Sequence, residues 1–240
     1  MTNSIDKPQE IDSTEMEETE ATETVETHLV ARYPLANIKE TVTKQELAQY
    51  PSEGYDGKII VVQSELEAKK ASAYLLDIGR NDVLGFDTET RPSYKKGEIH
   101  LISLVQICTA SECFLFRTVD PKIWEYLKPV LEDENILKIG LSLKDDFRGM
   151  QRATRRELSI EPKNFIDLQS YTKQFGIRDC GLSRIYANLF RKKISKKMRL
   201  TNWEASFLTN EQKRYAALDA FATRRIYMEL ERRKQEECQL

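Results

Sequence analysis

The chain has 240 residues, 40% of them hydrophobic, which is enough for one domain of ordinary size with a sizeable core. No apolar run approaches 18 residues, and no basic start followed by an apolar stretch is present, so neither a membrane span nor a secretory signal is expected. We therefore expect a cytoplasmic protein with no membrane partner.

The net charge of −2 is unevenly distributed. Residues 1–28 hold nine acidic side chains and one lysine, so they carry −8 and the other residues carry +6. The tail has no aromatic residue and no glycine, so we expect 1–28 to be a disordered acidic tail. Residues 29–57 are expected to form an N-terminal arm, and residues 58–235 the domain. A mildly basic domain behind an acidic tail suits a polyanionic ligand.

The cysteines do not indicate a metal site. Cys108, Cys113, Cys180 and Cys238 contain no CxxC pair, and the chain has only two histidines, so the short paired spacings of a structural zinc site are missing. We expect the cysteines to be reduced.

Hydrophobic patterning predicts alternating elements from residue 58 onward. Strands are expected at 58–63, 82–89, 99–109, 112–119, 136–140 and 164–168. Helices are expected after residue 64, from Pro121 to about residue 131, around 147–155, and from about residue 169 to the end. Capping boxes begin at Thr43, Ser64 and Thr209. Three strands as a meander, followed by strand–helix alternation, predict an α/β fold with a mixed sheet flanked by helices.

Asp87 and Glu89 end the strand expected at 82–89. Because side chains alternate across a strand, the two carboxylates share one face. Adjacent carboxylates repel unless a cation lies between them, and oxygen ligands suit hard ions such as Mg²⁺ and Mn²⁺. Acidic residues are also common where strands end in turns, so this pair alone is a weak signal.

Two further motifs carry acidic residues on helices. Asp145 and Asp146 begin the helix after the strand at 136–140, where capping and the helix dipole favour aspartate in any case, so only one of them need be functional. Tyr215 and Asp219 are four residues apart on the helix that Thr209 caps, so they project from one helical face. By itself, this second motif favours a partly exposed amphipathic helix over a functional pair.

Together, these residues resemble the DEDD exonuclease superfamily, in the tyrosine subtype that includes ribonuclease D and the Werner syndrome exonuclease domain. The resemblance covers about residues 58–230, and segment 199–203 is also Werner-like. The family aspartate lies six residues after Gly140, which selects Asp146 over Asp145. Ser142 departs from the polymerase branch, which often has Asn at this position. Neither histidine is near Asp219, which excludes the sister subtype that uses His in place of Tyr.

The resemblance implies a ribonuclease H-like fold and metal-dependent 3′→5′ hydrolysis of nucleic acid, DNA favoured over RNA, releasing nucleoside 5′-monophosphates. It implies two divalent metal ions, Mg²⁺ or Mn²⁺, with the ligands Asp87, Glu89, Asp146 and Asp219. Asp87 would bridge both ions, Glu89 and Asp219 would hold the ion that carries the attacking water, and Asp146 would act indirectly on the other ion. Tyr215, the fifth catalytic residue, would orient the water, because a phenol with a pKa of about 10 is a poor base at neutral pH.

Basic residues precede the third motif. Residues 184–199 contain seven of them and no acid, so we expect the segment to neutralise the phosphates of a single-stranded 3′ end, DNA or RNA. Tyr94 and its two lysine neighbours follow the first motif closely enough to contact the same strand. The expected nucleic-acid contacts are Lys95, Lys96, Arg191, Lys192, Lys193, Lys196, Lys197 and Arg199. A solvated surface remains the alternative for the basic segment.

Two other functions remain open. The first is a nucleic-acid-binding module of the same fold with a decayed active site, which the intact set of acids argues against. The second makes the acidic tail a docking element for a protein partner, with nuclease activity secondary.

Overall fold

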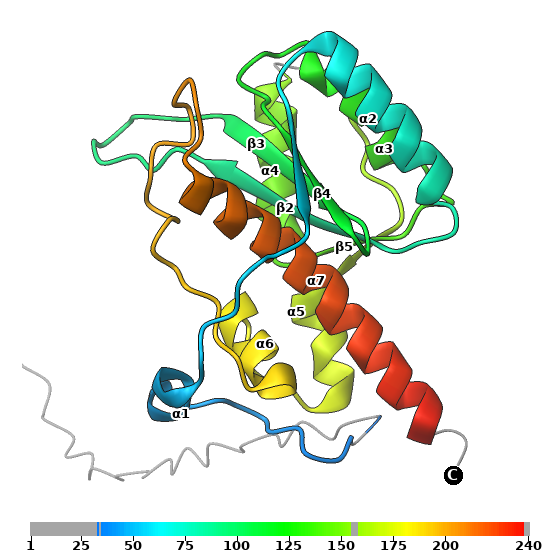
Figure 1. The fold of residues 1–240 in the computed structure, drawn as a ribbon, viewed down its shortest axis with the longest axis vertical. Helices are drawn as coiled ribbons and strands as arrows, with labels where there is room; N and C mark the ends of the chain where they lie inside the picture. Colours follow the sequence, from blue (N-terminus) through cyan, green and yellow to red (C-terminus); the bar gives the residue numbers. More distant parts are fainter. Residues whose placement is uncertain (1–32, 34, 155–157, 238–240) are drawn as a thin grey trace, which may run out of the picture.

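The computed structural model describes residues 33, 35–154 and 158–237, so the expected acidic tail of residues 1–28 lies outside the described residues. The described part has three layers, with helices on both faces of one mixed sheet (Figure 1). The sheet has six strands in the order β1-β4-β3-β2-β5-β6. The strands are β1 (Lys58–Val62), β2 (Leu84–Thr90), β3 (Ile102–Cys108), β4 (Glu112–Phe116), β5 (Lys138–Gly140) and β6 (Phe165–Asp167). The α/β fold class with a mixed sheet is confirmed.

The helices include one long element near the C-terminus. They are α1 (Lys44–Gln49), α2 (Glu65–Ile78), α3 (Ile123–Glu132), α4 (Leu143–Ala153), α5 (Leu168–Tyr171), η1 (Thr172–Phe175), α6 (Leu182–Phe190) and α7 (Asn210–Glu237). The capping boxes at Thr43 and Ser64 are present, and Thr209 exchanges the two capping hydrogen bonds with Gln212 at 3.0 and 3.1 Å. Within the described residues, no helix is long and apolar enough to cross a membrane.

The sheet separates two hydrophobic cores. One face of the sheet packs against α7, with α5 and α6 in the same hydrophobic core, and the opposite face is covered by the layer of α2, α3 and α4 (Figure 1). Alternation along β3 supplies both cores: Leu104 faces α7, and its neighbour Val105 faces the other layer. Every residue of β3 is buried, as expected for an interior strand that is covered on both faces.

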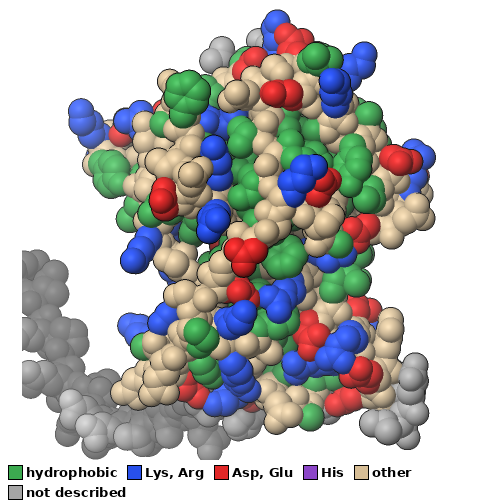
Figure 2. Space-filling view, in the orientation of Figure 1, with side chains coloured by type: hydrophobic (Ala, Val, Ile, Leu, Met, Phe, Trp, Pro, Cys, Tyr) green, Lys and Arg blue, Asp and Glu red, His purple; other side chains and the backbone are tan. Residues whose placement is uncertain are grey.

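The sequence pattern predicted a helix from about residue 169 to the end, and this prediction is wrong for part of the segment. Helix α6 ends at Phe190, because the next residue, Arg191, has a left-handed backbone (φ 55°), and α7 begins only at Asn210. The intervening residues 192–209 form a loop with turns and bends but no helix. Figure 2 shows Lys and Arg side chains gathered along the side of the molecule where this loop lies.

The described part of the N-terminal arm packs against α6 and the segment before it. The Lys39 amide donates to Asn188 Oδ1 at 3.0 Å, and the Val42 amide donates to Asp179 Oδ2 at 2.7 Å. The side chain of Val42 is completely buried. This part of the arm is therefore integrated into the fold rather than extended away from it.

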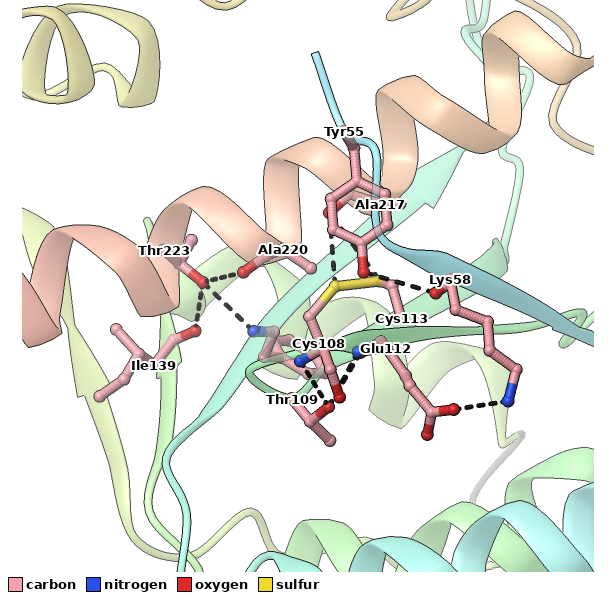
Figure 3. Close-up of a disulfide and its surroundings, with 12 residues drawn as sticks. Tyr55, Lys58, Cys108, Thr109, Glu112, Cys113, Ile139, Ala217, Ala220 and Thr223 are labelled. Carbon is pink, nitrogen blue, oxygen red and sulfur yellow. Dashed lines mark hydrogen bonds and ion pairs between the residues drawn. A yellow bond between two sulfur atoms is a disulfide. The ribbon is translucent and has the colours of Figure 1, made fainter. Parts of the chain in front are cut away.

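The expectation of reduced cysteines is wrong for two of them. Cys108 and Cys113 form a buried disulfide that joins β3 to β4, with their Cα atoms 4.1 Å apart (Figure 3). The short hairpin puts the two residues directly opposite each other, a pairing that CxxC spacing does not detect. Both sulfurs contact the carbonyl oxygen of Ala217 in α7, at 3.3 and 3.8 Å. The disulfide therefore lies directly under the helix that carries Tyr215 and Asp219.

Candidate active site

Asp87 and Glu89 lie on β2, an interior strand of the sheet. Strand β2 pairs with β3 on one side and with β5 on the other, so its backbone is held from both directions. The two carboxylates face α7, and together with Asp219 they offer oxygens that all lie within 4.8 Å of one another. The alternation along the strand predicted that Asp87 and Glu89 share one face, and Asp219 approaches them from α7.

Helix α7 approaches β2 closely because of Gly85. A Cβ atom at this position would lie 2.0 Å from the carbonyl oxygen of Ala220, so only glycine allows the helix to lie this near. One turn further along, the Thr223 hydroxyl accepts a hydrogen bond from the Phe86 amide at 3.3 Å. The same hydroxyl lies 2.8 Å from the Ile139 carbonyl of β5, to which it can donate. These contacts position Asp219 opposite the two carboxylates of β2.

Asp146 lies in the first turn of α4, which follows β5. It accepts a hydrogen bond from the Thr88 hydroxyl and is not one of the three carboxylates that lie within 4.8 Å of one another. Its neighbour Asp145 has a side chain that is 84% exposed, and its ion pair is with Arg148 at 3.6 Å. The structure thus brings Asp146, and not Asp145, to the edge of the acidic group.

Ser142, the position at which the sequence departs from the Asn of the polymerase branch, lies in the turn before α4. Ser142 adopts a left-handed backbone (φ 64°, ψ 36°), a conformation that Asn tolerates better than most residues. The amides of Ser142 and Leu143 donate to the carboxylate of Asp167, each at 3.0 Å. Asp167 therefore stabilises the start of the helix that carries Asp146.

The pKa values of the three carboxylates in the acidic group are raised. Burial raises the pKa of Asp87 well above its usual value, and the charges of Asp219 and Glu89 raise it further. Burial and the charge of Asp219 raise the pKa of Glu89 to about 9, opposed by the charge of Arg199. Burial also raises the pKa of Asp219 to about 7, although the Tyr215 hydroxyl and Lys196 favour its ionised form. Such carboxylates are poorly stabilised unless a cation joins them.

The pKa values of Tyr215 and Asp146 are also raised. Burial, together with the charges of Asp219 and Glu89, raises the pKa of the Tyr215 phenol above its usual value. Its hydroxyl is therefore protonated at neutral pH. Burial raises the pKa of Asp146 to about 6, and the hydrogen bond from Thr88 opposes that change.

The acidic group opens into a cleft of about 290 Å³. Its walls include Tyr215 and the three carboxylates, and two basic residues of the loop before α7, Lys196 and Arg199. Of the expected phosphate contacts, these are the two that line the cleft. Lys197 instead lines a neighbouring pocket of about 230 Å³, which shares Tyr215 as a wall.

The other expected contacts in this loop hold the N-terminal arm. Lys192 forms an ion pair with Glu53 at 3.0 Å, and Lys193 donates to the carbonyl oxygen of Ala48 at 2.7 Å. Arg191 donates to the carbonyl oxygen of Asn37 at 3.0 Å. The basic segment is therefore divided between the cleft and the arm. Lys95 and Lys96 are exposed in the loop after β2.

Three residues that position the site were not identified from the sequence. The Thr88 hydroxyl donates a hydrogen bond to Asp146, and Gly85 leaves room for α7 to lie against β2. Thr223 joins α7 to the sheet by a hydrogen bond from the Phe86 amide. Two of them had a signal: a glycine interrupts an otherwise apolar strand, and Thr223 is four residues after Asp219 on the same helical face. Thr88 had none, because its partner is 58 residues away.

Comparison with known proteins agrees with this geometry. The profile of a 3'-5' exonuclease family matches residues 59–235, which include all four acids and Tyr215. The chain belongs to the DEDD 3′→5′ exonuclease family. As a member of this family, it is an exonuclease that acts on nucleic acid, and the family uses divalent metal ions.

Relatives of this exonuclease differ widely in length. The mouse bifunctional 3'-5' exonuclease/ATP-dependent helicase WRN is 31% identical over 155 residues, which are 62% of this chain but 11% of the mouse protein. A 3'-5' exonuclease of Arabidopsis thaliana is 27% identical over 209 residues, covering 82% of this chain and 69% of that protein.

Solved structures share the fold of this exonuclease. The EXO domain of Aedes aegypti Nibbler has a TM-score of 0.66 at 22% identity, covering 77% of this chain and 94% of that one. Escherichia coli RNase D has a TM-score of 0.62 at 20% identity, and the match covers 76% of this chain and 47% of that one. The expected ribonuclease H-like fold is confirmed.

Proposed function

We propose that this chain removes nucleotides from the 3′ end of single-stranded nucleic acid by a tyrosine-subtype, two-metal mechanism and releases nucleoside 5′-monophosphates. The observation that carries the proposal is the group of Asp87, Glu89 and Asp219, whose oxygens lie within 4.8 Å of one another and which lines a cleft. We propose DNA as the favoured substrate.

The residues present fit divalent metal ions. Three carboxylates with raised pKa values share one small volume, and oxygen ligands are those that Mg²⁺ and Mn²⁺ prefer. Asp87 would bridge two such ions, and Glu89 and Asp219 would hold one of them. Asp146, held by Thr88 outside the close group, would act on the other ion indirectly. When bound, the ions would activate the attacking water and neutralise charge on the scissile phosphate.

Tyr215 would orient the attacking water rather than deprotonate it. Burial and the nearby carboxylates keep its phenol protonated, so its hydroxyl is a hydrogen-bond donor beside Asp219. Glu89 is better suited to accept the proton of the water, because a carboxylate is the stronger base of the two once a cation has offset its neighbours.

The preference for DNA rests on the relatives. The mouse protein with 31% identity is named as a 3'-5' exonuclease joined to a helicase, and segment 199–203 is Werner-like. The RNase D structures support only the fold, because their identity to this chain is about 20%.

A side-by-side digestion tests the proposal. Single-stranded DNA, recessed duplex DNA and RNA of one sequence, labelled at the 5′ end, are incubated with the full chain and Mg²⁺ or Mn²⁺. We expect a ladder that shortens from the 3′ end, fastest on single-stranded DNA, with 5′-monophosphates as products and no shortening in EDTA. Faster digestion of RNA would contradict the substrate preference. Binding without shortening would instead favour the decayed module.

We also propose that the acidic tail docks a basic surface of a protein partner. Residues 1–28 carry −8 and lie outside the described residues. A pull-down that compares the full chain with a chain lacking residues 1–28 tests this. Recovery of the same partners by both chains would contradict a docking role.

A further inference from the structure

We propose that two loops beside the cleft form a surface on which the bases of a single-stranded nucleic acid stack, with Tyr94 and Leu200 as the stacking side chains. We call this surface the two-loop rim; it consists of residues 94–96, between β2 and β3, and residues 199–200, before α7. The inference rests on the proposed function, because it adds base contacts to the strand that the cleft would degrade.

The two loops are joined at several points. The Tyr94 hydroxyl donates to the carbonyl oxygen of Leu200 at 3.2 Å. Further along, the carboxylate of Glu204 contacts both ends of the β2–β3 loop. Its Oε2 lies 3.2 Å from Arg91 Nη1, and its Oε1 lies 2.9 Å from His100 Nδ1. The rim is therefore one structural unit, although its two parts are about a hundred residues apart in sequence.

Exposed apolar side chains are concentrated on these loops. Among the described residues, eight large hydrophobic side chains are exposed, and four of them lie in residues 91–101 and 199–209: Tyr94, Ile99, Leu200 and Phe207. Tyr94 is 77% exposed although its hydroxyl is anchored, and Leu200 is 59% exposed. An anchored ring with a bare face loses little entropy when a base stacks on it.

The rim is continuous with the cleft. Strand β2 carries Asp87 and Glu89 and runs directly into the first loop, and Arg199, which lines the cleft, immediately precedes Leu200. A strand whose 3′ end lies at the carboxylates would therefore pass the rim as it leaves the cleft.

The charge of the rim fits a nucleic-acid strand. The amide of Glu98 donates to the carbonyl oxygen of Lys95 at 3.2 Å, which closes a tight turn in which Gly97 has a φ of 86°. This turn presents Lys95 and Lys96 beside Tyr94, and basic and hydrophobic side chains lie together over this loop in Figure 2. Within the described part of the chain, neither lysine forms an ion pair with an acidic side chain, so both can contact phosphates.

Aromatic and apolar faces beside cations select single strands. In a duplex the base faces are already stacked on one another, whereas a single strand exposes them. The rim therefore predicts preferential binding of single strands with little dependence on sequence, because every base has a face that can stack.

A binding experiment with the full chain in EDTA, where hydrolysis is absent, tests the rim. Fluorescence anisotropy compares a labelled single strand with a strand of equal length that lacks bases upstream of its 3′ nucleotide. We expect Tyr94→Ala to weaken binding of the first strand by roughly 5- to 150-fold and to leave the abasic strand unaffected. Tyr94→Phe, which keeps the ring, should retain most of the affinity.

Three further variants separate stacking from other effects. Leu200→Ala should weaken binding of the normal strand only, and Leu66→Ala, which removes an exposed leucine from α2, should change neither. Lys95→Ala with Lys96→Ala should weaken binding of both strands alike, because both contain phosphates.

Two outcomes would overturn the inference: wild-type affinity of Tyr94→Ala for the normal strand, or an equal loss on both strands. If the wild-type chain digests single strands while Tyr94→Ala has an unchanged affinity and KM, the rim is wrong and the proposed function stands. If the wild-type chain neither binds nor digests any strand, the proposed function itself has failed.

Discussion

Gly85 on β2 lies against the backbone of Ala220 on α7, so closely that a Cβ atom at position 85 would be 2.0 Å from the Ala220 carbonyl oxygen. This contact sets the separation between the strand that carries Asp87 and Glu89 and the helix that carries Asp219. Because both partners of the contact are backbone, rotation of a side chain cannot relieve a clash there.

Gly85→Ala should therefore reduce both stability and activity. Overpacking of this kind costs about 1–3 kcal/mol, and a displacement of about 1 Å at a catalytic group can reduce the rate about 100-fold. Thermal melting and kcat on a single strand measure the two effects. Gly54→Ala is the matched control, because a Cβ atom there meets nothing within 4 Å. Wild-type kcat in Gly85→Ala would mean that the spacing of α7 does not govern the site.

Asp87→Ala should abolish hydrolysis and leave the fold intact. Asp87 is the carboxylate placed to join both metal ions, and loss of several kcal/mol of transition-state stabilisation lowers the rate by about 100-fold or more. Initial rates with Mn²⁺, compared with a metal-free blank, measure the loss, and circular dichroism checks the fold. Activity within about tenfold of wild type would exclude Asp87 as the shared ligand.

Asp146→Ala should lose most activity, and Asp145→Ala little. Asp146 is partly buried beside Thr88 at the edge of the acidic group, whereas the side chain of Asp145 is 84% exposed and pairs with Arg148 on the surface. Thr88→Val, which removes the hydroxyl that holds Asp146, should fall between the two. The same rate assay ranks the three variants. The opposite order for the two aspartates would place the catalytic residue at 145.

The metal-free protein should become less stable as the pH rises. The pKa of Asp219 is about 7 in the folded chain and near 4 in the unfolded chain, so between these values the folded state retains a proton that the unfolded state has lost. The free energy of unfolding then falls by about 1.4 kcal/mol per pH unit for each such proton.

Asp219→Asn tests this in EDTA. The variant lacks the titrating group, so it should be more stable than the wild type near about pH 8, and the difference should shrink towards about pH 4. Mn²⁺ should reverse the order, because the wild type then gains a ligand that the variant has lost. Melting curves across this pH range give the result. A wild type that is the more stable protein in EDTA at high pH would contradict the raised pKa.

The two halves of the basic segment should behave differently. Lys196 and Arg199 line the cleft, whereas Lys192 and Lys193 contact the arm. Changing the first pair to Ala should weaken binding and flatten the plot of log affinity against log salt by about 1.4, from about 0.7 per phosphate contact. Changing Lys192 and Lys193 instead should lower the melting temperature and leave the slope unchanged. Equal slopes in both variants would mean that the strand does not pass the cleft loop.

The sequence alone determined the features that depend on neighbouring residues. The capping boxes at Thr43, Ser64 and Thr209, and the alternation that puts Asp87 and Glu89 on one face, follow from local geometry. The α/β fold class followed for the same reason, because the order of strands and helices is read along the chain. The family motif extended this prediction to Asp219.

Only the tertiary structure decided which distant residues meet. Strand register joined Cys108 to Cys113, and the position of the arm divided the basic segment, so that Lys192 holds Glu53 while Lys196 reaches the cleft. Gly85 and Thr88 became parts of the site through partners on α7 and α4. A local pattern can mark a residue such as Gly85 as unusual, but it does not identify the partner, because each contact depends on where two elements that form independently come to lie against each other.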